Sequence, residues 1–157
     1  MSKRLIRAIL ALTVVSLAIG VAMAGAQGSS TQFTASMKGS SESPKGPSSA
    51  KGTFKVEFRS GNRACYTMSV SGLGAKPVAA HIHKGKAGVN GGIVIDLKPT
   101  FTGTSPRVSK KCVTGSASVI SAIKKNPSGY YANVHTTKNP GGAARGQLKA
   151  DTSGNNG

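Results

Sequence analysis

Apolar and polar side chains alternate along much of the chain, and the clearest case covers residues 53–59. Phe54, Val56 and Phe58 recur there at every second position, with Lys, Glu or Arg beside each of them. Because successive side chains of an extended strand point to opposite faces, this pattern predicts a half-buried β-strand. The alternation resumes over residues 64–73 after a short glycine-containing turn, so the two segments together predict a β-hairpin.

The same pattern predicts further strands, and one segment has the spacing of a helix. Strands are expected at residues 31–37, 78–83, 93–97, 108–113, 130–136 and 143–150. Val119, Ala122 and Ile123 fall at the i, i+3, i+4 spacing of one helical face, which predicts a helix over 118–126. A helix this short is not stable alone, so we expect it to pack on a sheet. Many short strands with one short helix indicate an all-β protein, an antiparallel β-sandwich.

The inward positions of these elements form a modest core. Its predicted members are Phe54, Val56, Phe58, Tyr66, Met68, Val70, Leu73, Ile82, Ile93, Ile95, Leu97, Val119, Ile123, Tyr130, Val134 and Leu148. Residues 38–52 are rich in Ser, Pro, Gly and Lys, so they are expected to form a solvated loop.

The first 26 residues have the layout of a signal peptide. Three basic residues precede an apolar run, and small residues suited to cleavage follow at Ala24 and Ala26. We therefore expect a protein that is secreted or associated with the cell surface, with an uncleaved membrane anchor as the alternative. The remainder suits one domain. We expect it at residues 32–149, with a first strand and a Ser/Pro/Gly-rich loop within 27–52 and a disordered tail at 150–157.

Cys65 and Cys112 are the two cysteines of the chain. In an oxidising compartment two cysteines in one small domain usually pair, so a disulfide is expected. Alternation puts Cys65 opposite Tyr66 and Met68, which places the bridge near a strand end or on the outer face of a sheet. Two free thiols and metal ligation remain as alternatives.

The three histidines fall in two of the predicted strands. His81 and His83 share one strand face, and His135 shares a face with Tyr131 and Asn133. If the two strands are neighbours, the histidines meet at one spot. Three imidazole nitrogens would suit a mononuclear Zn²⁺ or Cu²⁺ site. Alternatively the rings hydrogen-bond to backbone carbonyls and to polar neighbours and so fix the adjoining loops.

The chain is strongly basic, with 21 Lys and Arg against 4 Asp and Glu and a formal charge of +17. This balance favours attraction to polyanions, which outside a cell are anionic cell-wall polymers or acidic glycans. Lys84, Lys86, Lys110 and Lys111 are the candidate contact residues. A solvated surface that keeps the protein soluble is the alternative. The sequence has neither a recognised nucleic-acid motif nor an aromatic stacking run, so specific nucleic-acid binding is not expected.

Two segments together resemble a known family. HIHKGKAGVNGGIVIDL at residues 81–97 and NPSGYYANVHTTKNPGGAARGQL at 126–148 are similar, in order and spacing, to the CHRD domain. The resemblance implies an extracellular β-sandwich of the immunoglobulin-like or superoxide-dismutase-like kind, with no established enzymatic activity. Glu42-Ser43-Pro44 is similar to the Glu-Val-Pro-Pro element common near the start of CHRD domains.

Arg145 lies in the second of these segments. Many CHRD members carry Glu where this chain has Ala143-Ala144, which removes a partner for Arg145. Asp96 is the remaining candidate, so an Arg145–Asp96 contact is expected. Tyr131 and Asn133 are expected to support the histidine cluster.

Catalysis is not expected. The four acidic residues are scattered, and a paired-carboxylate site would need two of them to meet. His-x-His followed by glycine also resembles copper/zinc superoxide dismutase, but that binuclear site needs more histidines than this chain has. The sequence therefore predicts an exported, non-catalytic binding or structural module without a required cofactor. Mononuclear Zn or Cu binding through the histidines and polyanion adhesion through the basic surface are the two alternatives.

Overall fold

The structure is a computed structural model that describes residues 31–153. The predicted signal peptide and residues 154–157 lie outside the described residues. The strands are β1 Gln32–Lys38, β2 Lys51–Arg59, β3 Arg63–Ser71, β4 Pro77–Lys84, β5 Ile93–Asp96, β6 Arg107–Thr114, β7 Tyr130–Thr136, β8 Ala144–Gln147 and β9 Lys149–Ala150. The helix α1 spans Ala117–Lys125, and short 3-10 turns occur at Gly39–Ser41 (η1) and Pro127–Gly129 (η2).

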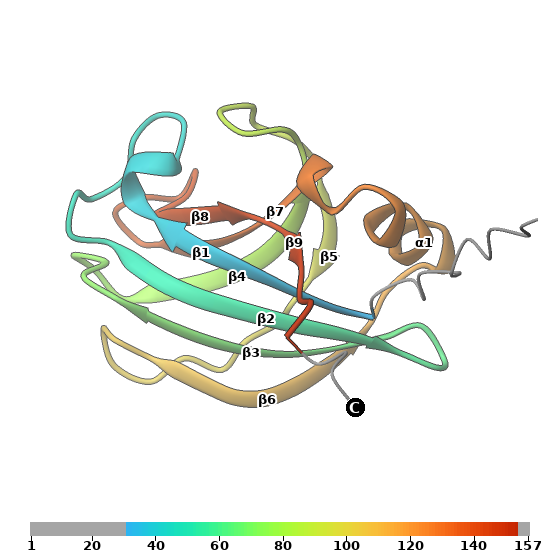
Figure 1. The fold of residues 1–157 in the computed structure, drawn as a ribbon. Coiled ribbons are helices and arrows are strands. Elements are labelled where there is room, and N and C mark those ends of the chain that lie inside the picture. The colour runs from blue at the N-terminus through green and yellow to red at the C-terminus, as the bar shows by residue number, and fades with distance from the viewer. Residues whose placement is uncertain (1–30, 154–157) are drawn as a thin grey trace, which may run out of the picture.

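The strands form an antiparallel sheet in the order β5-β4-β7-β8-β1-β2-β3-β6, with β9 on β1. The sheet curls on itself, so that β4, β5 and β7 form one layer over β2, β3 and β6 (Figure 1). Residues of β5 and β6, the two ends of the order, line one hollow, which places these edges close together. This is the β-sandwich that the sequence predicts, close to a closed barrel.

The core lies between the two layers and follows the predicted alternation. Phe54, Val56 and Phe58 are each at most 3% exposed. Tyr66 of β3 crosses the core, and its hydroxyl donates a 2.9 Å hydrogen bond to the Leu97 carbonyl just after β5. The interior therefore joins strands that are far apart in the strand order.

Ile93 is not in the core, although the alternation of β5 predicts it there. The register of β4 and β5 shifts between Ile82 and His83, so Ile93 pairs with His83 on the outer face. Its side chain is 55% exposed, whereas Ile95 is 3% exposed. A register irregularity of this kind adds a residue that the period-2 pattern cannot anticipate.

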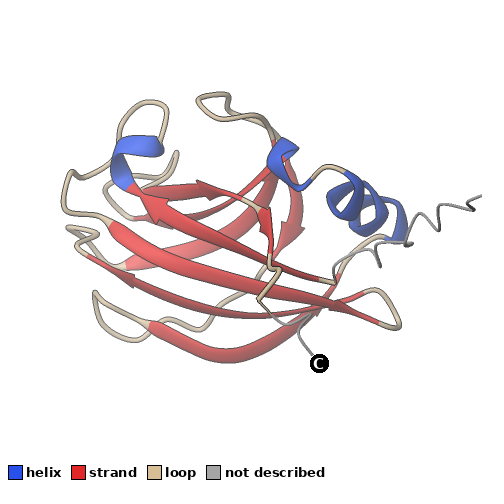
Figure 2. Cartoon of the chain, viewed as in Figure 1, coloured by secondary structure: helices blue, strands red, loops and turns tan. Residues whose placement is uncertain are grey.

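Helix α1 occupies the predicted segment and covers one end of the sandwich (Figure 2). Ser116 caps its N-terminus, because its hydroxyl accepts a 3.3 Å hydrogen bond from the Val119 amide. Ile120 and Ile123 are the buried residues of the helix, while Val119 is only partly buried. Within residues 31–153, no helix has the length and apolarity needed to span a lipid bilayer.

The two ends of the domain are more ordered than the sequence predicts. The segment 38–52, expected to be solvated, contains η1 and buries Glu42 to 5% exposure. At the C-terminal end Ala150 belongs to β9, and the Asp151 amide donates to the Gln32 carbonyl at 2.9 Å. The predicted tail therefore starts inside the sheet.

Cys65 and Cys112 form the predicted disulfide. They lie directly opposite each other on β3 and β6. Their neighbours Ala64 and Tyr66 point into the core, so the bridge lies on the outer face of the sheet. The disulfide fastens β6, an edge strand, to the rest of the sheet.

Candidate metal centre

The three histidines meet on the outer face of β4 and β7, which are neighbours in the sheet. His81 lies opposite Asn133, His83 opposite Tyr131, and His135 opposite Ala79. The alternate residues of the same strands, such as Ile82 and Val134, are fully buried in the core. The predicted clustering of His81, His83 and His135 is therefore confirmed.

The imidazole rings converge on a small volume. His81 Nδ1 lies 2.9 Å from His135 Nε2. One nitrogen from each ring can be chosen so that all three lie within 4.8 Å of one another. Zinc–nitrogen bonds of about 2.0–2.1 Å with tetrahedral angles separate two ligand nitrogens by about 3.3 Å, so rings that hold an ion would have to adjust toward this separation.

Two of the rings are oriented by backbone carbonyls. His83 Nδ1 donates to the Gly91 carbonyl at 2.8 Å, and His135 Nδ1 donates to the Pro140 carbonyl at 2.8 Å. A neutral imidazole carries one proton, so both Nε2 atoms are left with a free electron pair. A hydrogen bond from the remote nitrogen is the usual way in which a metal-ligating histidine is fixed.

The third ring has two possible partners. With its proton on Nδ1, His81 donates to His135 Nε2. With its proton on Nε2, it faces Asp96 Oδ1 at 3.9 Å and leaves Nδ1 free. The second tautomer completes a ligand set of His81 Nδ1, His83 Nε2 and His135 Nε2.

Burial favours the neutral form of the histidine rings, which is the form that binds metal. His83 and His135 are 7% and 8% exposed. Desolvation lowers the pKa of each below its ordinary value, against the opposing effect of the carbonyl bonds. Desolvation also lowers the pKa of His81, and the nearby His135 and His83 lower it further.

His83 Nε2 and the side-chain oxygen Asn133 Oδ1 are buried, and neither makes a well-formed hydrogen bond among the described residues. The Asn133 side chain nevertheless interacts with the His83 ring, and this interaction raises the His83 pKa against the effect of burial. An ion or water at His83 Nε2 would take the place of this contact. A nitrogen-donor set with this chemistry fits Zn²⁺ or Cu²⁺.

Tyr131 and Arg145 support the His83 ring in a stack. The Tyr131 ring lies parallel to the His83 ring, with centroids 4.9 Å apart and an interplanar angle of 3°. The Arg145 guanidinium lies 4.6 Å from the centre of the Tyr131 ring. The Tyr131 hydroxyl accepts a 3.2 Å hydrogen bond from the Gly91 amide, so the stack and the loop carrying Gly91 hold His83 together.

Arg145 does not contact Asp96, and that prediction is wrong. Asp96, His81, Asn133 and Arg145 are successive partners across four neighbouring strands. Three strand spacings of about 4.8 Å separate Arg145 from Asp96 by about 14 Å, beyond the reach of the side chains. The Asp96 carboxylate instead accepts a 3.0 Å hydrogen bond from the Lys98 amide.

Glu42 is the partner of Arg145, and sequence reasoning did not include it among the site residues. Arg145 Nε donates to Glu42 Oε2 at 2.6 Å, and both side chains are at most 2% exposed. The remaining guanidinium nitrogens donate to the Val89 carbonyl at 3.0 Å and to Asn90 Oδ1 at 2.6 Å. The one available signal was the position of Glu42, a rare acid in a basic chain, in the segment similar to the Glu-Val-Pro-Pro element.

The four lysines predicted to contact a polyanion are not gathered at one place. Lys84 ends β4 and Lys86 lies in the loop after it. Lys110 and Lys111 lie on β6, and they line different hollows.

The family model for the CHRD domain matches residues 33–148. The chain belongs to the CHRD domain family. The match spans both histidine strands and Glu42, so the metal-ligand candidates lie inside the family's own domain. No curated protein matches the chain closely enough to count as a relative.

Solved structures show the same fold as this CHRD domain. A mutant of Candida albicans superoxide dismutase 5 superposes with a TM-score of 0.54 at 13% identity, covering 78% of this chain and 92% of that chain. A second mutant of the same protein gives a TM-score of 0.52 at 14% identity, covering 77% and 92%. At such low identity the likeness concerns the fold alone.

Proposed function

We propose that this CHRD domain is a non-catalytic binding module and that its ligand is a single Zn²⁺ or Cu²⁺ ion held by His81, His83 and His135. The observation that carries the proposal is the convergence of three imidazoles, of which His83 and His135 are buried and His81 is partly buried, with remote nitrogens that face acceptors.

The residues of the site have two roles in the proposed metal binding, as ligands and as groups that orient the ligands. His81 Nδ1, His83 Nε2 and His135 Nε2 are the ligands, and the carbonyls of Gly91 and Pro140 orient two of the rings. Asp96 favours the tautomer of His81 that leaves Nδ1 free, because its carboxylate attracts a proton on Nε2. An ion bound to this set would cross-link β4 and β7, and it would accept the electron pair of His83 Nε2.

The acidic residues support the non-catalytic part of the proposal. Glu42, Glu57 and Asp151 are each engaged with a basic side chain. Asp96, the fourth, faces His81 at 3.9 Å. The solved structures named superoxide dismutases share the fold, and superoxide turnover by the metal-loaded protein would contradict the non-catalytic assignment.

We further propose that the domain works outside the cell. The predicted leader supports export, and the Cys65–Cys112 disulfide is of the kind that persists in oxidising compartments.

The test is metal content by elemental analysis and Zn²⁺ and Cu²⁺ affinity by calorimetry of the purified protein. A His81→Ala/His83→Ala double variant removes two ligands, and a Val78→Ala/Lys84→Ala variant changes two exposed residues of the same strand as a matched control. We expect one ion per chain at micromolar affinity or tighter, lost in the histidine variant and retained in the control.

A different result would make the histidines structural. In that case the purified protein binds no ion, and the histidine variant has a lower melting temperature that metal does not influence. A metal-dependent rise in melting temperature seen only with intact histidines supports the proposal independently of calorimetry.

A further inference from the structure

A second surface of the domain has the character of a binding site, and it lies away from the histidines. It is the outer face of β1, β2, β3 and β6, where alternate residues point to solvent. The basic residues on this face are Lys38, Lys51, Lys55, Arg59, Arg63, Arg107 and Lys110.

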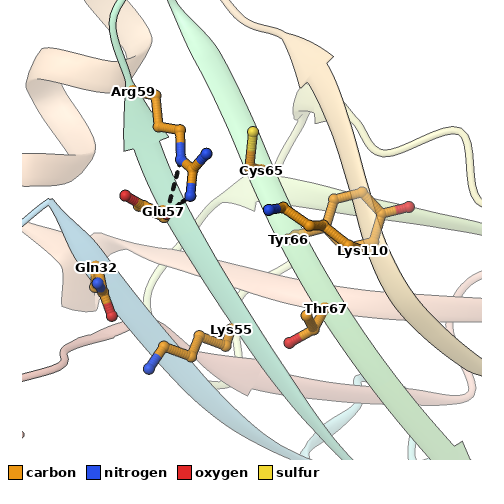
Figure 3. Close-up of a pocket in the computed structure, with 8 residues that line it drawn as sticks. All are labelled: Gln32, Lys55, Glu57, Arg59, Cys65, Tyr66, Thr67 and Lys110. Atoms are coloured by element: carbon orange, nitrogen blue, oxygen red, sulfur yellow. Dashed lines mark hydrogen bonds and ion pairs between the residues drawn. The ribbon is translucent and has the colours of Figure 1, made fainter.

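Two hollows adjoin on this face and share Thr67 as a common wall. The first, of about 260 Å³, is lined by Gln32, Lys55, Glu57, Arg59, Cys65, Tyr66, Thr67 and Lys110 (Figure 3). The second, of about 320 Å³, is lined by Thr53, Thr67, Met68, Ser69, Arg107, Val108 and Ser109. We call these two adjoining hollows, whose lining residues come from β1, β2, β3 and β6, the basic groove.

Acidic residues neutralise only part of the basic groove. Lys55 binds Asp151 at 2.8 Å, and Arg59 donates to the Glu57 carboxylate at 2.8 Å through Nε. Among residues 31–153, no carboxylate pairs with Arg107 or Lys110, which line the groove, or with Arg63, which lies opposite Arg59 on the same face. Figure 3 shows Lys110 reaching from β6 over β3, so an uncompensated cation overhangs the groove. An anionic ligand is therefore the complementary occupant.

The groove lacks the features that a membrane or a nucleic acid would use. The large apolar side chains that stand exposed in the described chain are Val78, Val89 and Ile93, and all three lie on or between β4 and β5. Insertion into a lipid surface needs such residues on the binding face. No aromatic ring points outward from β1, β2, β3 or β6, so bases have nothing on which to stack.

The uncharged lining of the groove favours a carbohydrate. Thr53, Thr67, Ser69 and Ser109 contribute hydroxyl groups, and Gln32 contributes an amide. These groups donate and accept hydrogen bonds with sugar hydroxyls, while the cations select acidic substituents.

We propose that the basic groove binds an acidic polysaccharide. The chain lies across β1, β2, β3 and β6, with its sulfate or carboxylate groups on Arg63, Arg107 and Lys110. Cys65 lines the first hollow, and its disulfide with Cys112 keeps β6 in register with β3. Of the four lysines that the sequence predicts as polyanion contacts, only Lys110 lines the groove.

The test compares two charge-reversal variants of the whole protein. Arg63→Glu/Arg107→Glu/Lys110→Glu removes two unpaired cations that line the groove and the neighbouring Arg63, and Lys76→Glu/Lys125→Glu/Lys138→Glu makes the same charge change elsewhere on the surface. Binding to dextran sulfate, polygalacturonate and uncharged dextran is measured by calorimetry at about 0.15 M salt, where long-range attraction is screened. Anionic phospholipid vesicles and single-stranded DNA are measured in parallel.

We expect the groove variant to bind the two acidic polysaccharides at least tenfold more weakly than the wild type and the surface variant to stay within threefold. The variant Arg63→Gln/Arg107→Gln/Lys110→Gln should show the same loss if charge reversal impairs folding. Binding by the wild type should be unchanged in the presence of a chelator, because the histidines lie on β4 and β7.

Three results would overturn the proposal. One is equal weakening in the groove and surface variants, which would assign binding to net charge alone. Another is an affinity of the wild type for acidic polysaccharides no higher than for uncharged dextran. The third is tighter binding to the vesicles or the DNA through the same three cations. None of these results bears on the metal site.

Discussion

At the scale of single residues, Arg145 organises the surroundings of the histidine cluster more than any of the three histidines does. Its guanidinium joins Glu42 of the segment before β2, Val89 and Asn90 of the loop before β5, and the face of Tyr131. Three parts of the chain that are distant in sequence are thus tied to β8. A guanidinium suits this role, because it presents several donors in a fixed plane and also stacks on an aromatic ring.

Glu42→Gln should destabilise the domain by about 3 kcal/mol, because it leaves the Arg145 charge buried without a counter-ion. Glu57→Gln is the matched control, since it breaks a pair whose side chains are 46% and 32% exposed, and it should cost less than about 1 kcal/mol. Urea unfolding at neutral pH measures both. Equal losses in the two variants would show that the buried pair has no special role.

At the scale of elements, the β4–β5 loop connects His83, a candidate metal ligand, to Tyr131 on the neighbouring strand β7. The Gly91 carbonyl accepts from His83, and the Gly91 amide donates to the Tyr131 hydroxyl. The Lys84 amide donates to the Gly92 carbonyl at 3.1 Å, which closes the base of the loop. The loop therefore fixes which nitrogen of His83 is free.

Gly91→Ala should weaken metal binding at least tenfold and cost about 2 kcal/mol of stability. A Cβ at Gly91 would lie 1.5 Å from the Lys84 carbonyl oxygen, so the loop must shift and take its carbonyl away from His83. Gly92→Ala is the control, because nothing lies within 4 Å of a Cβ there. Calorimetry with Zn²⁺ and urea unfolding provide the two readouts, and identical metal affinities in both variants would exclude the positioning role.

At the scale of the whole molecule, cross-links hold together a sheet whose two ends approach each other. The disulfide fastens β6 to β3, and the Tyr66 hydroxyl bonds the Leu97 carbonyl beyond β5. Burial raises the pKa of Tyr66 to about 12, and the nearby Asp96 carboxylate adds to this rise. The folded protein therefore holds the neutral phenol at a pH where an unfolded chain has lost its proton.

The domain should lose stability steeply between about pH 10 and pH 12. An unfolded tyrosine ionises near pH 10, so the Tyr66 contribution is complete below that pH and falls by about 1.4 kcal/mol for each further pH step up to about 12. Tyr66→Phe should cost about 1 kcal/mol at neutral pH and lack this part of the decline. Urea unfolding from pH 8 to 11.5 measures both curves. Parallel curves would mean that Tyr66 does not titrate as a buried group.

Much of the architecture was accessible from the sequence because it depends on local periodicity. Alternation located β2, β3 and β7, and the i, i+3, i+4 spacing with a serine cap located α1. The same alternation put all three histidines on outward faces. The Cys65–Cys112 disulfide was predicted because the chain has two cysteines and an expected oxidising location. Each of these inferences needs only near neighbours in the chain.

The exposure of Ile93 and the partner of Arg145 could not be predicted from the sequence, because they depend on strand register and on how loops fold back onto the sheet. A single register shift between β4 and β5 turned Ile93 outward. Arg145 cannot reach Asp96 because β7 and β4 lie between their strands. It pairs with Glu42 because the segment before β2 folds back onto β8.

The sequence by itself determined the strands, their faces and the residue types available for metal and polyanion binding. Only the tertiary structure decided that β4 lies beside β7, which brings the histidines together, and that β3 pairs with β6, which forms the basic groove. The physical reason is that a period-2 pattern fixes the side to which a residue points, while strand order and register are set by the packing of the whole core.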